Sequence, residues 1–179
     1  NFSDRTVRDI YNFAQNRGID YVELGFFHNE EADPNRGKYR YCSTRNEEIR
    51  QVFRSTKNIT KLSAMRDIQR PLSQLIPAKE SIIDTVRILT RSPETDLDVL
   101  DRYLTEALEL GYEVFLNFTS AGHNTIETNI RFAEFAKAKG AHALEFADTE
   151  SVMTEDYVRD TIRECHKVGV KMGCHFHDR

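Results

Sequence analysis

Residues 125–146 read TIETNIRFAEFAKAKGAHALEF, and this stretch decides the fold of the chain. An amphipathic segment over 125–139 has the spacing of a helix, glycine follows at position 140, and 143–146 form a short apolar run. Glycine just after a helix commonly adopts the left-handed conformation that ends it. A short apolar run after such a stop is typical of a buried strand. The stretch therefore predicts a helix, a glycine cap and a strand, in that order.

The same order of helix, glycine and strand occurs three more times along the chain. Gly111, Gly140 and Gly169 follow one another at intervals of 29 residues, a spacing natural to a repeated helix–strand unit. Gly18 ends the remaining helix of this kind. The other expected helix–strand pairs are 9–17 with 21–24, 97–110 with 113–116, and 155–168 with 170–174, and two further strands are expected at 59–65 and 83–89.

Strands that alternate with helices build a parallel sheet with right-handed crossovers. Six such strands fit either an open doubly wound sheet or a (β/α)8 TIM barrel. No Gly-x-Gly-x-x-Gly or Gly-x-x-x-x-Gly-Lys turn follows any expected strand, which argues against the nucleotide-binding, doubly wound version. A complete barrel takes about 250 residues, whereas the chain has 179 and ends on its sixth strand. We therefore expect the α/β class, with residues 1–179 forming one partial TIM-barrel catalytic domain that holds strands two to seven.

The composition is that of an ordinary soluble protein. The chain is 39% hydrophobic and 30% charged with a net charge of -4, so a mainly nucleic-acid partner is not expected. No apolar run approaches the roughly 20 residues of a membrane span, and no signal-like segment begins the chain. Cys42, Cys165 and Cys174 form no Cys-x-x-Cys motif, which favours reduced thiols and a cytoplasmic location.

His175-Phe176-His177 closes the last expected strand and is the main candidate site. Residues two apart on a strand point to the same face, so the two imidazoles converge as the ligands of a divalent metal at a barrel mouth would. Cys174 points to the opposite face. A surface histidine pair, or one histidine bonded to a backbone carbonyl, would give the same tripeptide.

Other polar residues follow the expected strands, at the end of a barrel where chemistry is located. Glu23 is either a functional carboxylate or the structural partner of Arg87, because a buried charge needs a partner. Asp148 is either functional or a cap for the backbone after its strand. The full set of strand-end polar residues is Glu23, Ser63, Arg87, Thr90, Asn117, Asp148, Thr149, His175 and His177.

The loop 37–43, GKYRYCS, is the longest aromatic and basic segment between expected elements. It follows the strand of Glu23, so Tyr39 and Arg40 are candidates to cover the site and hold an anionic substrate. An ordered loop without a binding role is the alternative. His123 and His142 are interpreted as a loop residue and an exposed strand residue.

Three motifs resemble the metal-dependent aldolase/acyltransferase superfamily, the DRE-TIM metallolyases, which includes HMG-CoA lyase, isopropylmalate synthase and 4-hydroxy-2-oxovalerate aldolase. Residues 21–26, YVELGF, are similar to its Ile-Glu-x-Gly-Phe segment. Residues 146–153, FADTESVM, resemble its Asp-Thr-x-Gly-x-(Met/Leu) signature, with Glu150-Ser151 where Phe-Gly or Ala-Gly is common. Residues 173–178, GCHFHD, resemble its Gly-x-His-x-His-Asn strand, and the 37–42 loop resembles the 4-hydroxy-2-oxovalerate aldolase branch.

The resemblance implies that His175 and His177 bind a divalent metal, Mn2+ or Mg2+, and that Glu23 and Asp148 have catalytic roles. Substrate contacts are expected from Arg87, Tyr39, Arg40 and Thr149. The superfamily's first-strand motif, Asp-x-Thr-Leu-Arg-Asp-Gly, supplies a third metal ligand and an arginine, and it does not occur in these residues. Asp178-Arg179 also stands where Asn-Asn is usual.

The implied function is an aldolase that cleaves a 4-hydroxy-2-oxo acid to pyruvate and an aldehyde through a metal-stabilised enolate. The 2-oxo acid is then the partner, with no nucleic acid or membrane involved, and a homo-oligomer or an aldehyde dehydrogenase is a further possible partner. No strand-end residue is a compelling base for the 4-hydroxyl proton. One alternative is Claisen condensation of an acyl-CoA with a 2-oxo acid. Another is a barrel fragment that is not catalytic as it stands.

Overall fold

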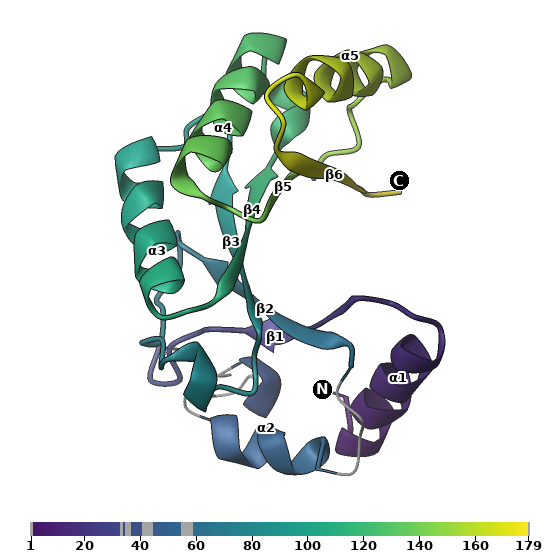
Figure 1. Ribbon diagram of the computed structural model, residues 1–179, viewed down its shortest axis with the longest axis vertical. Coiled ribbons are helices and arrows are strands. Elements are labelled where there is room, and N and C mark those ends of the chain that lie inside the picture. The colour runs from purple at the N-terminus through teal and green to yellow at the C-terminus, as the bar shows by residue number, and fades with distance from the viewer. Residues whose placement is uncertain (1, 33, 35–36, 41–44, 55–58, 179) are drawn as a thin grey trace. The chain divides into compact units, whose positions relative to one another are not determined.

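The computed structural model describes residues 2–32, 34, 37–40, 45–54 and 59–178 (Figure 1). Tyr41, Cys42 and Ser43 of the expected loop lie outside the described residues. The chain divides into two compact units. The first unit comprises residues 1–87 and 109–112, and the second comprises residues 88–108 and 113–179.

Six strands form one sheet in the order β1-β2-β3-β4-β5-β6. Their bounds are β1 Tyr21–Phe26, β2 Lys61–Asp67, β3 Thr85–Arg91, β4 Glu113–Thr119, β5 Ala143–Asp148 and β6 Lys171–Phe176. The pairs β1/β2, β4/β5 and β5/β6 are parallel. A doubly wound sheet reverses its strand order at a switch point, whereas a (β/α)8 barrel adds each strand beside the one before. The expected fold class, an incomplete TIM barrel, is therefore confirmed.

Three helices begin directly after a capping side chain, and the first of them begins five residues before its expected start at residue 9. Ser3 caps α1 (Asp4–Asn16), Thr125 caps α4 (Ile126–Lys139) and Thr154 caps α5 (Glu155–His166), each accepting a backbone N–H of the first turn. The other helices are α2 (Asn46–Val52), α3 (Leu97–Glu109) and the short 3-10 helices η1 (Lys38–Arg40), η2 (Ala78–Glu80) and η3 (Ala121–His123). The four glycines expected to follow helices all have the predicted positive φ, between 68° and 88°.

Each unit has its own apolar core. In the first unit, Tyr11 of α1 is buried, packs edge-on against Phe53 at 5.0 Å between ring centroids, and donates its hydroxyl to the carbonyl of Thr60. In the second unit, Phe118 of β4 stacks on Phe132 of α4 at 4.2 Å. The helices α4 and α5 lie side by side over β4, β5 and β6 (Figure 1). These contacts hold the carboxyl ends of the three strands at one edge of the sheet.

The last strand differs from its expectation as a buried strand. β6 is half exposed, and both His175 and Phe176 at its end are exposed. The reason is its place in the sheet, because β6 is last in the order and pairs with β5 alone among the described strands. No described helix combines the length and the apolar character needed to cross a lipid bilayer.

Candidate active site at the carboxyl ends of the strands

The two histidines of the last strand lie next to each other, as their spacing predicts. The ring centroids of His175 and His177 are 4.8 Å apart, with 50° between the ring planes. Both rings therefore point to the same side of the end of β6, and both residues are exposed. The register pairs His175 with Ala147, which places the histidines beside the end of β5.

The ring of His177 is oriented by the loop that follows β5. Its Nδ1 lies 3.0 Å from the carbonyl oxygen of Asp148, and Ser151 Oγ donates to the carbonyl of His177 at 2.8 Å. A carbonyl only accepts, so Nδ1 must carry the proton and Nε2 keeps its lone pair. This is the tautomer of histidines that bind a metal through Nε2 while the other nitrogen donates to the backbone.

The carboxylate of Asp148 is directed to the backbone of its own loop. Its Oδ1 accepts the N–H of Val152 at 2.8 Å and its Oδ2 accepts the N–H of Met153 at 3.0 Å. This is the capping arrangement that the sequence left open as an alternative to a catalytic role. Among the described residues, no three His, Cys, Asp or Glu side chains are grouped so that they could hold one metal ion. The histidine pair would therefore offer a metal ion two ligands, and any others would have to come from elsewhere.

Thr149 and Ser151, in the turn after β5, have structural roles. Thr149 Oγ1 accepts the N–H of Ser120 at 2.9 Å, so the expected substrate-binding hydroxyl contacts the end of β4. Ser151 has φ 55°, the left-handed conformation that glycine adopts at least cost. The Asp-Thr-x-Gly signature that residues 148–151 resemble has glycine at this position. The positive φ of Ser151 gives the physical reason, because glycine adopts that conformation at least cost.

A cluster of Ser120, His123 and Glu150 also lies at the ends of β4 and β5. Ser120 Oγ donates to Glu150 Oε1 at 2.8 Å, and His123 Nε2 is 3.8 Å from Glu150 Oε2. The sequence placed His123 correctly in a loop but did not connect it with the other two residues. Their positions directly after two strands were the available signal. His142, by contrast, precedes β5 and pairs with Glu113 at 2.9 Å.

The first unit contains the ion pair that the sequence predicted as one alternative for Glu23. Arg87 Nη1 donates to both carboxylate oxygens of Glu23, at 3.0 and 3.1 Å. The two residues come from β1 and β3, and β2 lies between these strands in the sheet. Their side chains therefore meet over β2, where Ser63 is the register partner of Glu23. The pair is largely buried on the arginine side, with 11% of the Arg87 side chain exposed.

The loop expected to cover the site folds back onto the first unit. Tyr39 donates its hydroxyl to Asp4 at 2.9 Å, and the guanidinium of Arg40 lies 4.5 Å from the ring centroid of Phe26. Burial, followed by the hydrogen bond to Asp4, raises the pKa of Tyr39. Gly25 explains the close approach, because a Cβ there would lie 1.7 Å from the carbonyl oxygen of Tyr39. Both expected substrate-binding side chains thus have partners within the chain.

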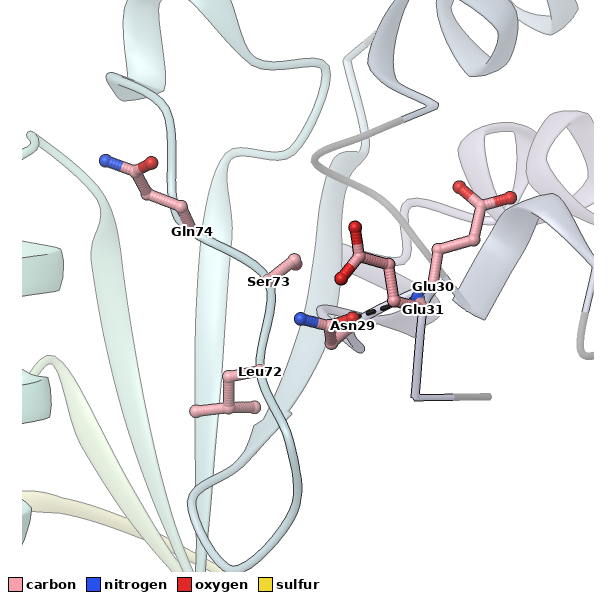
Figure 2. Close-up of a pocket in the computed structure, with 6 residues that line it drawn as sticks. All are labelled: Asn29, Glu30, Glu31, Leu72, Ser73 and Gln74. Atoms are coloured by element: carbon pink, nitrogen blue, oxygen red, sulfur yellow. Dashed lines mark hydrogen bonds between the residues drawn. The ribbon is translucent and has the colours of Figure 1, made fainter. Parts of the chain in front are cut away.

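A cavity of about 450 Å³ lies beyond the ends of β1 and β2 in the first unit. Figure 2 shows the side chain of Ser73 directed toward the 29–31 segment, whereas Leu72 and Gln74 extend the other way. None of the side chains expected in the site lines this cavity. Glu30, one of the two glutamates at this cavity, is ion-paired with Arg45. The lining residues are Asn29, Glu30, Glu31, Leu72, Ser73 and Gln74.

Fold and site together define an incomplete (β/α)8 barrel with a histidine pair at the end of one strand. The HMG-CoA lyase from Brucella melitensis has the same fold, with a TM-score of 0.72 and 14% identity over 99% of this chain and 66% of that chain. The HMG-CoA lyase from Bacillus subtilis matches with a TM-score of 0.69 and 14% identity, over 99% of this chain and 62% of that chain.

A third solved structure is the N-terminal domain of a Bacteroides vulgatus protein described as an aldolase. It matches with a TM-score of 0.68 and 19% identity, over 99% of this chain and 58% of that chain. The chain therefore spans about three fifths of the length of these proteins. At such identities the likeness concerns the fold. No protein family matches the sequence, and no curated protein matches it.

Proposed function

We propose that the chain is part of a divalent-metal-dependent lyase of the aldolase type, which cleaves a 4-hydroxy-2-oxo acid to pyruvate and an aldehyde. The observation that carries this proposal is the geometry of His177. Its Nδ1 is held 3.0 Å from the carbonyl of Asp148, which leaves Nε2 as a ligand beside the ring of His175. One imidazole fixed in this way beside a second, at a barrel's carboxyl face, has the form of half a metal site.

The donor set fits a divalent cation completed by oxygen ligands from outside the histidine pair. A site of imidazole and carboxylate without thiolate favours Mn2+ or Mg2+ over structural zinc. Burial raises the pKa of the neighbouring Cys174 thiol, which keeps it protonated and unsuited as a ligand. When bound, the cation would act as a Lewis acid that stabilises the enolate left when the carbon–carbon bond breaks.

Arg87 is proposed as a carboxylate-binding residue of the first unit. Glu23 accepts two hydrogen bonds from one terminal nitrogen of the guanidinium and so restricts where the guanidinium can lie. A planar guanidinium held in one orientation recognises a carboxylate better than a mobile one. The 37–42 loop resembles the 4-hydroxy-2-oxovalerate aldolase branch, which favours the aldolase over an acyl-CoA condensation.

The test is pyruvate release from 4-hydroxy-2-oxovalerate by the protein at its natural length. Pyruvate is followed by coupled NADH oxidation with lactate dehydrogenase. We expect release that depends on Mn2+ or Mg2+, stops on chelation with EDTA and returns when the metal is restored. Cleavage that survives chelation contradicts the proposal, and so does a complete lack of cleavage by metal-loaded protein. Release of free CoA thiol from an acyl-CoA and a 2-oxo acid would instead identify the condensing enzyme.

A further inference from the structure

We propose that His123 is the general base of this reaction and that Glu150 and Ser120 are the residues that position it. This inference rests on the proposed function, which requires a base for the 4-hydroxyl proton. The three side chains come from two turns of the second unit. Ser120 and His123 follow β4, and Glu150 follows β5, so both turns lie at the edge of the sheet where β6 ends in the histidine pair.

Ser120 holds the carboxylate of Glu150 in place. The hydroxyl of Ser120 donates to Glu150 Oε1 at 2.8 Å, and the backbone N–H of Ser120 donates to Thr149 Oγ1 at 2.9 Å. Two adjacent residues of the β5 turn are thus bonded to one residue of the β4 turn. The carboxylate of Glu150 is therefore held in one orientation before any substrate binds.

The other oxygen of the Glu150 carboxylate is free to accept a hydrogen bond from His123. Glu150 Oε2 is buried and has no hydrogen-bond partner among the described residues. A buried carboxylate oxygen without a donor is costly, and His123 Nε2 lies 3.8 Å from it, where a small movement would let it donate. Catalytic hydrogen bonds are often long in a protein without substrate and shorten in the reacting complex. Donation from Nε2–H to Glu150 leaves the lone pair of Nδ1 as the base.

The His123 side chain is accessible, whereas the turn that carries it is held rigidly. The His123 side chain is 55% exposed, so a substrate can reach it, while Ser120 is buried with φ 55°. A non-glycine residue persists in that strained conformation only where the surrounding structure holds it, and such residues are found at functional sites. The hydroxyl of Tyr157 in α5 donates a hydrogen bond to the carbonyl of Ala121 at 2.7 Å, which ties this turn to α5.

The turn after β5 connects the proposed base with the histidine pair. The β5 turn that carries Glu150 also carries Ser151, whose hydroxyl donates to the carbonyl of His177 at 2.8 Å. One turn therefore positions both the general base and the candidate metal ligand. Among the described residues, Asp148 and Tyr157 are two further titratable groups near the His123 turn: Asp148 Oδ1 is 3.3 Å from a Cβ placed on Gly122, and Tyr157 donates to Ala121.

The chemical step balances without any further reagent. His123 Nδ1 accepts the proton of the 4-hydroxyl, and the oxygen–hydrogen electron pair forms the C=O bond of the aldehyde as the bond between C3 and C4 breaks. The electron pair of that bond goes to the enolate of pyruvate. The imidazolium then returns the proton to C3 of the enolate, which gives pyruvate and neutral His123.

The kinetic test compares His123→Gln and His123→Ala with His166→Gln, an exposed histidine on α5 that serves as the matched control. We expect both His123 variants to lower kcat for 4-hydroxy-2-oxovalerate by roughly 10²- to 10⁴-fold with unchanged Mn2+ affinity. Imidazole in the buffer should restore part of the activity of His123→Ala. Full activity in the variants, or loss of activity only together with Mn2+ affinity, would overturn the proposal.

The positioning role has a readout that does not depend on the reaction. A carboxylate that accepts from Nε2–H selects the Nε2–H tautomer of the neutral imidazole, and 15N NMR distinguishes this tautomer from the Nδ1–H form. We expect the Nε2–H tautomer of His123 to predominate in the wild type and to lose population in Glu150→Ala. An unchanged tautomer ratio would overturn the pairing. If the ratio changes but the wild-type protein releases no pyruvate, the failure lies in the proposed function, and the base role falls with it while the pairing stands.

Discussion

The Nδ1 atom of His177 lies 3.0 Å from the carbonyl oxygen of Asp148, so the last residue of β5 orients the side chain that follows β6. This relationship joins two motifs that are separated by 29 residues in the chain. It also decides which ring nitrogen is available, because the carbonyl requires a donor. The nitrogen that His177 could offer to a metal therefore depends on a backbone carbonyl of another strand.

Removal of either histidine should weaken metal binding while the neighbouring cysteine is dispensable. We expect His175→Ala and His177→Ala each to weaken Mn2+ binding by more than about 100-fold, above the 10- to 100-fold effect typical of a lost supporting contact. Cys174→Ala should bind Mn2+ like the wild type. Calorimetric titration with Mn2+ measures all three. Equal binding by His177→Ala and the wild type would contradict the assignment.

Substitution of Asp148 separates its capping role from a catalytic one. Asp148→Ala leaves the N–H groups of Val152 and Met153 without their acceptors, and we expect the free energy of unfolding to fall by about 1–3 kcal/mol. Asp148→Asn retains one acceptor oxygen and should lose about half as much. Urea denaturation measures both variants. A loss of pyruvate release in Asp148→Asn far beyond its loss of stability would indicate a catalytic role as well.

The ion pair between Glu23 and Arg87 should show a measurable coupling energy. Both oxygens of the carboxylate accept from one nitrogen of a mostly buried guanidinium, so the pair exceeds an ordinary surface salt bridge. A double-mutant cycle with Glu23→Gln and Arg87→Met should give a coupling of about 1–2 kcal/mol. Independent, additive effects of the two substitutions would show that the contact contributes nothing to stability.

Gly25 should not tolerate a side chain. A Cβ at this position would lie 1.7 Å from the carbonyl oxygen of Tyr39, so η1 must move or the first unit must unfold. We expect Gly25→Ala to lower the free energy of unfolding by about 3 kcal/mol or more. Gly173→Ala is the matched control, because the nearest atom to its Cβ is Glu145 Cγ at 3.8 Å. Thermal melting of the two variants should differ clearly, and similar melting would contradict the close contact.

The thiol of Cys165 should make stability fall at alkaline pH. Burial, followed by the charge of Glu164, raises the pKa of Cys165 to about 11, against about 8.5 in an unfolded chain. Between these values the native state binds more protons than the unfolded state, so stability decreases as pH rises. We expect the wild type to lose roughly 2 kcal/mol more than Cys165→Ala between pH 8 and pH 10.5. Parallel pH profiles of the two proteins would contradict this.

The helix, glycine and strand pattern predicted the fold because it is local. A glycine that ends a helix does so through its own backbone conformation, without distant contacts. The positive φ values could therefore be predicted from the sequence. Element boundaries were less accurate. The strand expected at 59–65 is β2, Lys61–Asp67, and the helix α2, Asn46–Val52, was not predicted. A short helix of seven residues has too few turns for its periodicity to be distinctive.

Parts of the candidate site followed from the sequence for the same local reason. His175 and His177 share a face because they are two apart on a strand, and Glu23 with Arg87 was one of two readings because a buried charge needs a partner. The functions of these residues stay predictions. The engagement of Tyr39 by Asp4 was not predicted, because the two residues come from α1 and η1 and meet only in the folded unit.

The sequence by itself determined the class of fold, the order of the strands and the spacing of the histidine pair, because periodicity and glycine caps act within a few residues. Only the tertiary structure decided which nitrogen of His177 is available, that the carboxylate of Asp148 is directed to its own loop, and that Ser120, His123 and Glu150 form one cluster. The contacts of His177 with Asp148 and of Ser120 with Glu150 join residues 29 and 30 positions apart in the chain. They exist because parallel strands bring their carboxyl ends to one edge of the sheet, where distant turns share a surface.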